Sequence, residues 1–156
     1  MTAPAVIDRD ALGHALLDAA TAALEAMSFT LATDALDDGQ AAAPLDCVAT
    51  VTFDGPRRGV LALALCGDVL AEIAANMLGE DGVPARDVQR DALGELANVV
   101  CGNVTPHLAG AGAVYSLGAP VVRDDTGALP AGEPVARRVV GVETGRAELT
   151  LWVEGT

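Results

Sequence analysis

Basic residues are scarce in this sequence, and aromatic residues are scarcer still. There are 9 Lys and Arg residues against 22 Asp and Glu residues, a formal net charge of −13, and aromatic residues make up 3% of the chain. A charge this negative repels phosphate backbones and anionic membrane surfaces, so we expect no direct binding to nucleic acid or to membranes. Hydrophobic residues make up 51% and are mainly Ala, Val and Leu, which predicts an aliphatic core rather than disorder.

Several signatures of other protein classes are also missing. No apolar run reaches the roughly 18 residues that a membrane-spanning helix needs, and the start MTAPAVIDRDAL does not resemble an export signal. Cys47, Cys66 and Cys101 lack the spacing of a metal site, and two of them lie in apolar runs, as buried reduced thiols do. G-x-S-x-G, Walker and G-x-G-x-x-G motifs do not occur. We therefore expect a soluble cytoplasmic protein without a cofactor of its own.

Helical periodicity is present in three segments. Apolar residues at helical spacing predict a helix over about 9–27 and a short helix over about 69–78, with Asp68 as the N-cap of the second. A long helix is expected to begin near Arg86 and to stop or kink before Pro106, which cannot donate a backbone hydrogen bond.

Strand-like runs lie between and after these helices. Those at 47–53 and 59–66 flank the turn DGPRRG and predict a hairpin, and three more occur at about 113–122, 135–143 and 146–154. The last two flank Thr144-Gly145 and predict a second hairpin, 28–34 is a weaker strand candidate, and 37–46 is expected to be a loop. We therefore predict an α+β fold over residues 1–156 as a single domain. It would have a largely antiparallel sheet of five or six strands, with two long helices and one short helix packed against it.

The long helix carries an unusual polar stripe. At about 100° per residue, Asp91, Glu95, Asn98 and Gly102 fall on one side of the helix. Aliphatic residues cluster on the opposite side: Leu93, Leu96, Ala97, Val100 and Val104. Periodicity alone favours an ordinary solvent-facing surface. However, Asn and Gly are poor helix formers, and Gly costs about 1 kcal/mol relative to Ala, which also leaves open a functional surface.

The sequence D-A-L-G-E-L-A-N, from Asp91 to Asn98, resembles the D/S-x-x-x-E-x-x-N signature of the CheC/CheX/FliY chemotaxis phosphatases. Its continuation V-V-C-G-N is similar to the Asn-x-x-x-Gly-Asn stretch of the CheX branch, and NMLGEDG (76–82) resembles the end of the helix before it. Pro120 follows Asn98 by 22 positions, close to a proline of this family. Chain length and element order also suit a CheX-like, or CheC-like, domain.

The resemblance implies a phosphatase that acts on the phosphorylated aspartate of a CheY-type response regulator. In such enzymes the Asn orients the attacking water and the Glu pairs with a receiver Lys, which assigns Asn98 and Glu95 as catalytic residues. Asp91 and Gly102 are expected to contribute to binding, Gly102 by leaving clearance. The receiver supplies its own Mg²⁺, so no metal of this chain is implied. The alternative is a non-catalytic module on the same scaffold that binds a receiver or a flagellar switch component.

A partial copy of the signature lies near the start of the chain. RDALG occurs at 9–13 and again at 90–94, which favours an internal duplication, although five identities in an Ala-rich chain can arise by chance. The first copy has His14 and Leu17 at the Glu and Asn positions. CheC-like proteins can have two active helices, whereas CheX-like proteins keep one, so His14 and Leu17 indicate a single site. The resemblance also implies a homodimer paired through the sheet, with the C-terminal strands as candidates.

Overall fold

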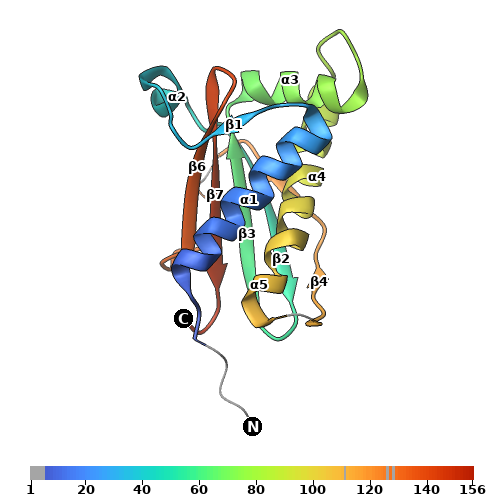
Figure 1. Cartoon of the computed structure of the whole chain (residues 1–156). Coiled ribbons are helices and arrows are strands. Elements are labelled where there is room, and N and C mark those ends of the chain that lie inside the picture. Colours follow the sequence, from blue (N-terminus) through green and yellow to red (C-terminus); the bar gives the residue numbers. More distant parts are fainter. Residues whose placement is uncertain (1–5, 111, 126, 128) are drawn as a thin grey trace.

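One antiparallel sheet organises the chain (Figure 1). The computed structural model describes residues 6–110, 112–125, 127 and 129–156. Within these residues the sheet has seven strands in the order β1-β6-β7-β3-β2-β4, and β5 also pairs with β2. The strands are β1 (Ala32–Thr33), β2 (Cys47–Asp54), β3 (Gly59–Leu65), β4 (Ser116–Leu117), β5 (Val121–Arg123), β6 (Ala136–Val142) and β7 (Gly145–Val153). The expected α+β fold is confirmed.

Two hairpins form the centre of the sheet. In the first, β2 pairs with β3 from Cys47 opposite Leu65 to Phe53 opposite Gly59. In the second, β6 pairs with β7, and the turn lies at Glu143 and Thr144, where Glu143 has φ 52. Both predicted hairpins are confirmed, and pairing of β3 with β7 joins them into one sheet.

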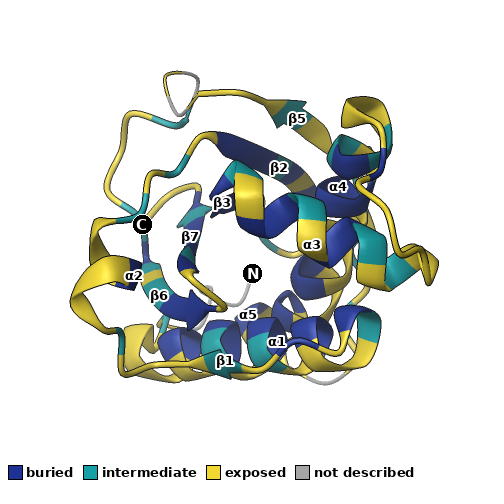
Figure 2. Cartoon of the chain, turned by 90° about the horizontal axis from the view of Figure 1, so that it is seen from above, coloured by how far each residue is buried: buried dark blue, intermediate teal, exposed yellow. Residues whose placement is uncertain are grey.

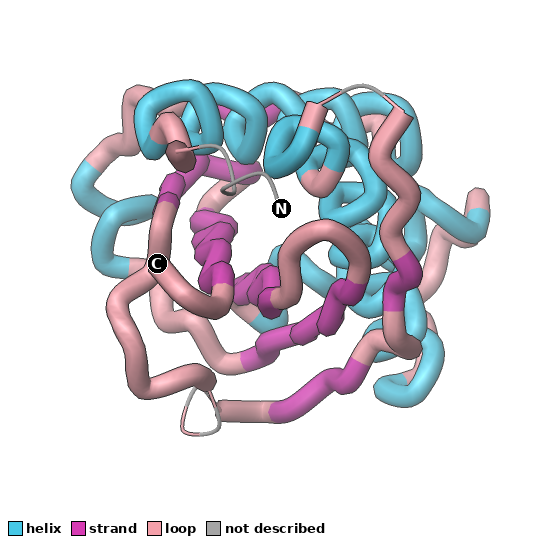
Figure 3. Tube along the Cα trace, turned by 90° about the horizontal axis from the view of Figure 1, so that it is seen from below, coloured by secondary structure: helices cyan, strands magenta, loops and turns pink. Residues whose placement is uncertain are grey.

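Two long helices lie on the same face of this sheet. They are α1 (Arg9–Ser28) and α4 (Arg86–Val104), and α3 (Gly67–Leu78) lies at one end of the strands (Figure 1). Seen from below, the strands form an arc and the helices close its open side (Figure 3). Two shorter helices complete the described chain, α2 (Asp38–Ala42) and α5 (Pro106–Ala109). The helix α4 ends just before Pro106, as predicted.

The core between helices and sheet is aliphatic, as the composition predicts. Buried residues lie on the inner sides of the helices and strands (Figure 2). The largest fully buried side chains are mostly leucines and come from α1, α3, α4, β2, β3 and β7. Each fully buried Leu stabilises the fold by roughly 1.5–3 kcal/mol relative to an exposed one. This packing fixes the rotation of α1 and α4 about their own axes.

The arrangement has an approximate internal twofold relation. The helix α1 packs on β6 and β1, and α4 packs correspondingly on β2, β4 and β5. The repeated RDALG places a glycine where each helix approaches the sheet. A Cβ added at Gly13 would lie 2.5 Å from Arg138 Nη2, and one added at Gly94 would lie 3.1 Å from Pro120 Cβ. Each copy of RDALG thus has a buried glycine of a long helix against a neighbouring segment, and the internal duplication stays a prediction.

The N-terminal ends of two helices differ from expectation. The loop expected at 37–46 contains α2, because Asp37 and Gln40 form a reciprocal capping box at its start. Asp68 was the expected N-cap of α3 but lies inside its first turn, and Cys66 is the N-cap residue without a side-chain cap. Instead the Asp46 carboxylate accepts a hydrogen bond of 2.6 Å from the Gly67 N–H. An acceptor 21 residues away cannot be identified from local sequence.

The prediction of a single strand over about 113–122 is also wrong. Two short strands, β4 and β5, occur there, and both pair with β2. Pro120 lies between them and has no N–H to donate to a ladder, so the strand is interrupted. With β1 counted as well, this raises the strand number from the expected five or six to seven.

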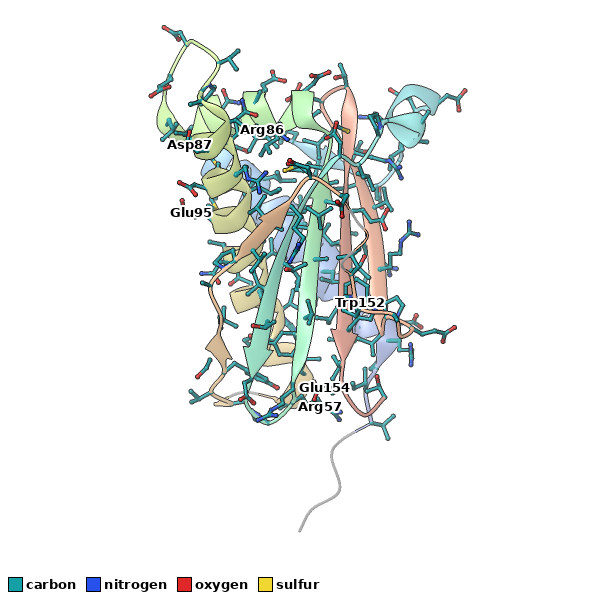
Figure 4. All side chains as sticks on the ribbon, turned by 180° about the vertical axis from the view of Figure 1, so that it is seen from behind. Arg57, Arg86, Asp87, Glu95, Trp152 and Glu154 are labelled. Atoms are coloured by element: carbon teal, nitrogen blue, oxygen red, sulfur yellow. The ribbon has the colours of Figure 1, made fainter. Side chains whose placement is uncertain are left out.

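The face of the sheet opposite the helices is covered in part by the segment before β6. Val48, Ala62 and Ala64 are buried there, with Leu129 and Trp152 packed on them. The Trp152 indole N–H donates to the Gly132 carbonyl at 2.9 Å, and Figure 4 shows this residue on the central strands. Trp152 is therefore not a contact at the sheet edge. Across the described chain, no helix combines the length and apolarity needed to cross a membrane.

Candidate functional site

The helix α4 separates its aliphatic and polar residues as predicted. Leu93, Leu96, Ala97, Val100 and Val104 are all buried, each at most 1% exposed. Asp91, Glu95, Asn98 and Gly102 are all exposed. Burial of the aliphatic side against α1 and β2 holds the polar stripe outward, so the same packing that stabilises the helix orients the candidate site.

Glu95 and Asn98 have no side-chain partners among the residues that the structure describes. Both lie on the outward side of α4, one helical turn apart, and Glu95 points away from the sheet in Figure 4. Among the described residues, neither side chain makes a hydrogen bond or an ion pair, and the same holds for Asp91. A carboxylate and a carboxamide that are exposed and unpaired can both contact a second molecule at the same time.

Two arginines hold a chain segment along one side of this stripe. Arg90 donates to the Val122 carbonyl at 2.6 Å and to the Asp124 carboxylate at 2.8 Å. Arg86 donates to the same carboxylate at 2.9 Å, and this interaction raises the pKa of the Arg86 guanidinium. The two residues they bind follow Pro120 closely in the chain, so the arginines hold the strand next to this proline against the helix.

Gly94 makes this close approach possible. It is buried, and an added Cβ would lie 3.1 Å from Pro120 Cβ, which is tighter than most side chains tolerate, and at an ordinary contact distance of 3.7 Å from Val122 Cγ2. Gly94 is one turn before Asn98, so Pro120 packs on α4 one turn away from the candidate catalytic residue. The sequence suggested Pro120 by its distance from Asn98, but nothing in it indicated the role of Gly94 or the arginine pair.

Gly102 has a different environment. An added Cβ would meet only Leu117 Cδ1, at 3.8 Å, which is an ordinary contact. Gly102 lies in the last turn of α4, where the backbone is still helical, and glycine within a helix costs about 1 kcal/mol relative to alanine. Packing within the described chain therefore gives no reason for a glycine here, and the open backbone faces the same side as Asn98.

A groove lies on the other side of the stripe. It has a volume of about 390 Å³, and its lining comes from the ends of α1 and α3 and the first half of α4. Apolar side chains form most of it: Met27, Met77, Leu78, Val88 and Ala92. Asp91 and Glu95 line its edge next to the candidate site. The sequence did not predict this groove, because its walls combine the end of α1 with α3 and α4, which follow much later in the chain.

The corresponding positions on α1 do not form a second site of the same kind. His14 is exposed, and its Nδ1 lies 2.8 Å from the Asp10 carbonyl of its own helix. Leu17 is half-buried and packs on the core. A hydrocarbon side chain cannot orient a water molecule, so the chemistry available at the Glu95 and Asn98 positions is absent from α1.

The cysteines are buried thiols. Cys47, Cys66 and Cys101 are all free and buried, as expected. Burial raises the pKa of Cys101 to about 12 and also raises that of Cys47, where Arg86 partly opposes the effect. The thiolate forms of Cys47 and Cys101 are therefore disfavoured at neutral pH. In the part of the chain that the structure describes, no three His, Cys, Asp or Glu residues are grouped as metal ligands.

Comparison with known families supports the resemblance carried by α4. The family model of the chemotaxis phosphatase CheX matches residues 47–137, which is more than half of the chain and includes the whole of α4. The chain belongs to the CheX family. A comparison with curated proteins finds no match.

Solved structures of CheX proteins share the fold. A CheX from Vibrio vulnificus matches with a TM-score of 0.72 at 21% identity, covering 96% of this chain and all (100%) of its own. A CheX from Desulfovibrio desulfuricans matches with a TM-score of 0.73 at 17% identity, covering 92% of this chain and 99% of its own. A CheX-CheY-BeF3-Mg²⁺ complex from Borrelia burgdorferi matches with a TM-score of 0.67 at 16% identity, with coverages of 95% and 99%. The CheX fold therefore extends over almost the whole chain.

Proposed function

We propose that this protein is a phosphatase that hydrolyses the aspartyl phosphate of a CheY-type response regulator. The observation that carries this proposal is the pair Glu95 and Asn98 in a member of the CheX family: both are exposed on the outward side of α4 and unpaired within the described part of the chain. The related CheX from Borrelia burgdorferi forms a complex with CheY, BeF3 and Mg²⁺, which supports a receiver of this type as the partner.

In this proposal Asn98 orients the attacking water. An acyl phosphate is already reactive, and the receiver supplies the Mg²⁺ and Lys that balance the charge of the phosphoryl group. The step that remains is to place a water in line with the phosphorus. A neutral carboxamide can accept from and donate to that water without repelling the phosphoryl oxygens, much as a Gln does in small GTPases.

Glu95 holds the receiver in position. One turn before Asn98, its carboxylate can pair with the receiver Lys beside the phosphoryl group while Asn98 reaches the water. Asp91 adds negative charge on the same face, and Gly102 leaves room for the receiver backbone to approach α4. The polar stripe then acts as one docking surface, with Glu95 for binding and Asn98 for hydrolysis.

The direct test is the decay of a phosphorylated receiver with and without this protein. We expect the wild type to accelerate decay, and Asn98→Ala to lower the accelerated rate by about 100-fold, the loss typical of one positioned hydrogen-bonding group. Asn98→Asp is the matched control, since it keeps the shape of the side chain but adds a charge that repels the phosphoryl oxygens. Wild-type decay rates with both variants would contradict the assigned role.

The alternative is a binding module without hydrolytic activity. It shares the docking surface and needs Glu95, but it has no use for a carboxamide at Asn98. Binding of the phosphorylated receiver with no change in its decay would establish this alternative. Possession of both residues favours hydrolysis.

We also propose a homodimer formed through the sheet. The strand β7 is internal, with β3 and β6 on its two sides, so it cannot supply an open edge. Among the described residues, β6 pairs on its outer side only with β1, at Val142 and Gly141, which leaves 136–140 open for a second copy. Sedimentation equilibrium should then give twice 15.7 kDa, and a monomer at micromolar concentration would refute the dimer.

A further inference from the structure

The apolar groove beside Glu95 has no occupant in the fold described above. Its walls include Leu78, which is 50% exposed, together with the half-buried Met27 and Met77. Phe29 lies two residues beyond Met27 and is 81% exposed, held outward by the left-handed C-cap of α1 at φ 55. Exposed apolar side chains next to a concave apolar surface are typical of an interaction site.

We propose that the groove receives an apolar side chain of the phosphorylated receiver, with a basic side chain of the receiver next to it. This rests on the proposed function. The groove shares Asp91 and Glu95 with the polar stripe of α4, so a receiver docked on the stripe covers both surfaces. It provides a second contact, separate from the one made by Asn98, and determines affinity rather than the chemical step.

Charge determines which kind of partner fits. Asp87, Asp91 and Glu95 follow one another at intervals of four residues along the exposed side of α4, and Asp87 and Glu95 both point outward in Figure 4. Like charges at this spacing repel each other. Within the described chain none of the three forms an ion pair, because Arg86 and Arg90 pair with Asp124 on the other side of the helix. A basic side chain from a partner would relieve this repulsion.

The same charges disfavour a second copy of this chain as the occupant. Two copies joined through the groove would bring two sets of carboxylates together, in chains that each carry a net charge of −13. The edge of β6 lies in the sheet, apart from the three helices that line the groove, and it is the edge used for dimerisation in the proposal above. The groove is therefore assigned to the receiver.

The test is the affinity for a receiver loaded with BeF3⁻ and Mg²⁺, measured by titration with the full chain. Leu78→Gln removes an apolar wall at a half-exposed position, where it should not disturb folding, and we expect the Kd to rise about tenfold. Val114→Gln is the matched control, because Val114 is 81% exposed and does not line the groove. Its Kd should equal that of the wild type. At saturating phosphatase, the decay rate of the phosphorylated receiver should be unchanged in Leu78→Gln.

Each outcome bears on a separate claim. A wild-type Kd for Leu78→Gln would overturn the groove as a receiver contact and leave the phosphatase proposal intact. A Leu78→Gln variant that changes from dimer to monomer in sedimentation would overturn it in favour of a second copy. A wild type that binds the loaded receiver without accelerating decay would refute the phosphatase, while a weaker Kd for Leu78→Gln would still support the groove.

Discussion

Gly102→Ala should change stability and activity in opposite directions. The residue lies in the last turn of α4, where the backbone stays helical through Thr105, and the new Cβ would make only an ordinary contact, 3.8 Å from Leu117 Cδ1. Nothing in the described chain therefore offsets the higher helix propensity of alanine, and we expect the free energy of unfolding to rise by about 1 kcal/mol. For a domain of this size that corresponds to an increase in Tm of about 2–4 °C, measurable by thermal melting.

The same methyl group would occupy the clearance that we assign to the receiver. A displacement of about 1 Å at a reacting centre can lower a rate by roughly 100-fold, so we expect receiver dephosphorylation to fall by about 10- to 100-fold. The two measurements use one purified variant: a melting curve, and the decay of a phosphorylated receiver. Loss of activity in a more stable protein cannot be attributed to partial unfolding.

Gly94→Ala is the contrasting variant on the same helix. Its Cβ would lie 3.1 Å from Pro120 Cβ, so the gain in helix propensity is offset by a forced shift of the neighbouring segment. We expect little or no increase in Tm. A stable Gly102→Ala variant with wild-type activity would refute the role of Gly102 in leaving room for the receiver. A destabilised Gly102→Ala variant would show that the new methyl group is not accommodated, and would refute the expected gain in the free energy of unfolding.

Two further predictions concern groups outside the polar stripe. Arg90→Ala removes the hydrogen bonds to Val122 and Asp124, so we expect the free energy of unfolding to fall by about 1–2 kcal/mol. We also expect receiver dephosphorylation to fall severalfold, because Pro120 is no longer held against α4. Wild-type activity in this variant would show that the position of Pro120 is not needed for dephosphorylation. Burial raises the pKa of Cys101 to about 12, so between pH 9.0 and about 12 the folded state keeps a proton that the unfolded chain loses, and stability should fall as pH rises through this range. Urea titrations at several pH values in this range should show that the free energy of unfolding falls less steeply with pH for Cys101→Val than for the wild type. An equally steep fall in both proteins would contradict this assignment.

Local patterns in the sequence predicted the parts of the fold that depend on neighbouring residues. The period of apolar residues in α4 predicted the exposure of Asp91, Glu95, Asn98 and Gly102, because one face of a regular helix must be buried, and Pro106 predicted where the helix ends. The two hairpins followed from turn residues between apolar runs. The assignment of roles to Glu95 and Asn98 came from the family resemblance, since an exposed Glu and Asn are common on helices.

Features that depend on distant residues could not be predicted in this way. The cap of α3 comes from Asp46, and the groove is assembled from the ends of three separate parts of the chain. The fixing of Pro120 requires Arg90 to meet Val122, 32 residues away. In each case the contact exists only after the sheet has brought the segments together, and the residue types involved are common on any surface.

The most direct measurement is the single-turnover decay of a phosphorylated receiver over a range of concentrations of this protein, for the wild type, Asn98→Ala and Glu95→Ala. The concentration dependence separates the maximal rate from the half-saturating concentration. We expect Asn98→Ala to lower the maximal rate by about 100-fold at nearly unchanged half-saturation, and Glu95→Ala mainly to raise the half-saturating concentration. A maximal rate for Asn98→Ala equal to that of the wild type would contradict a role for this carboxamide in orienting the attacking water.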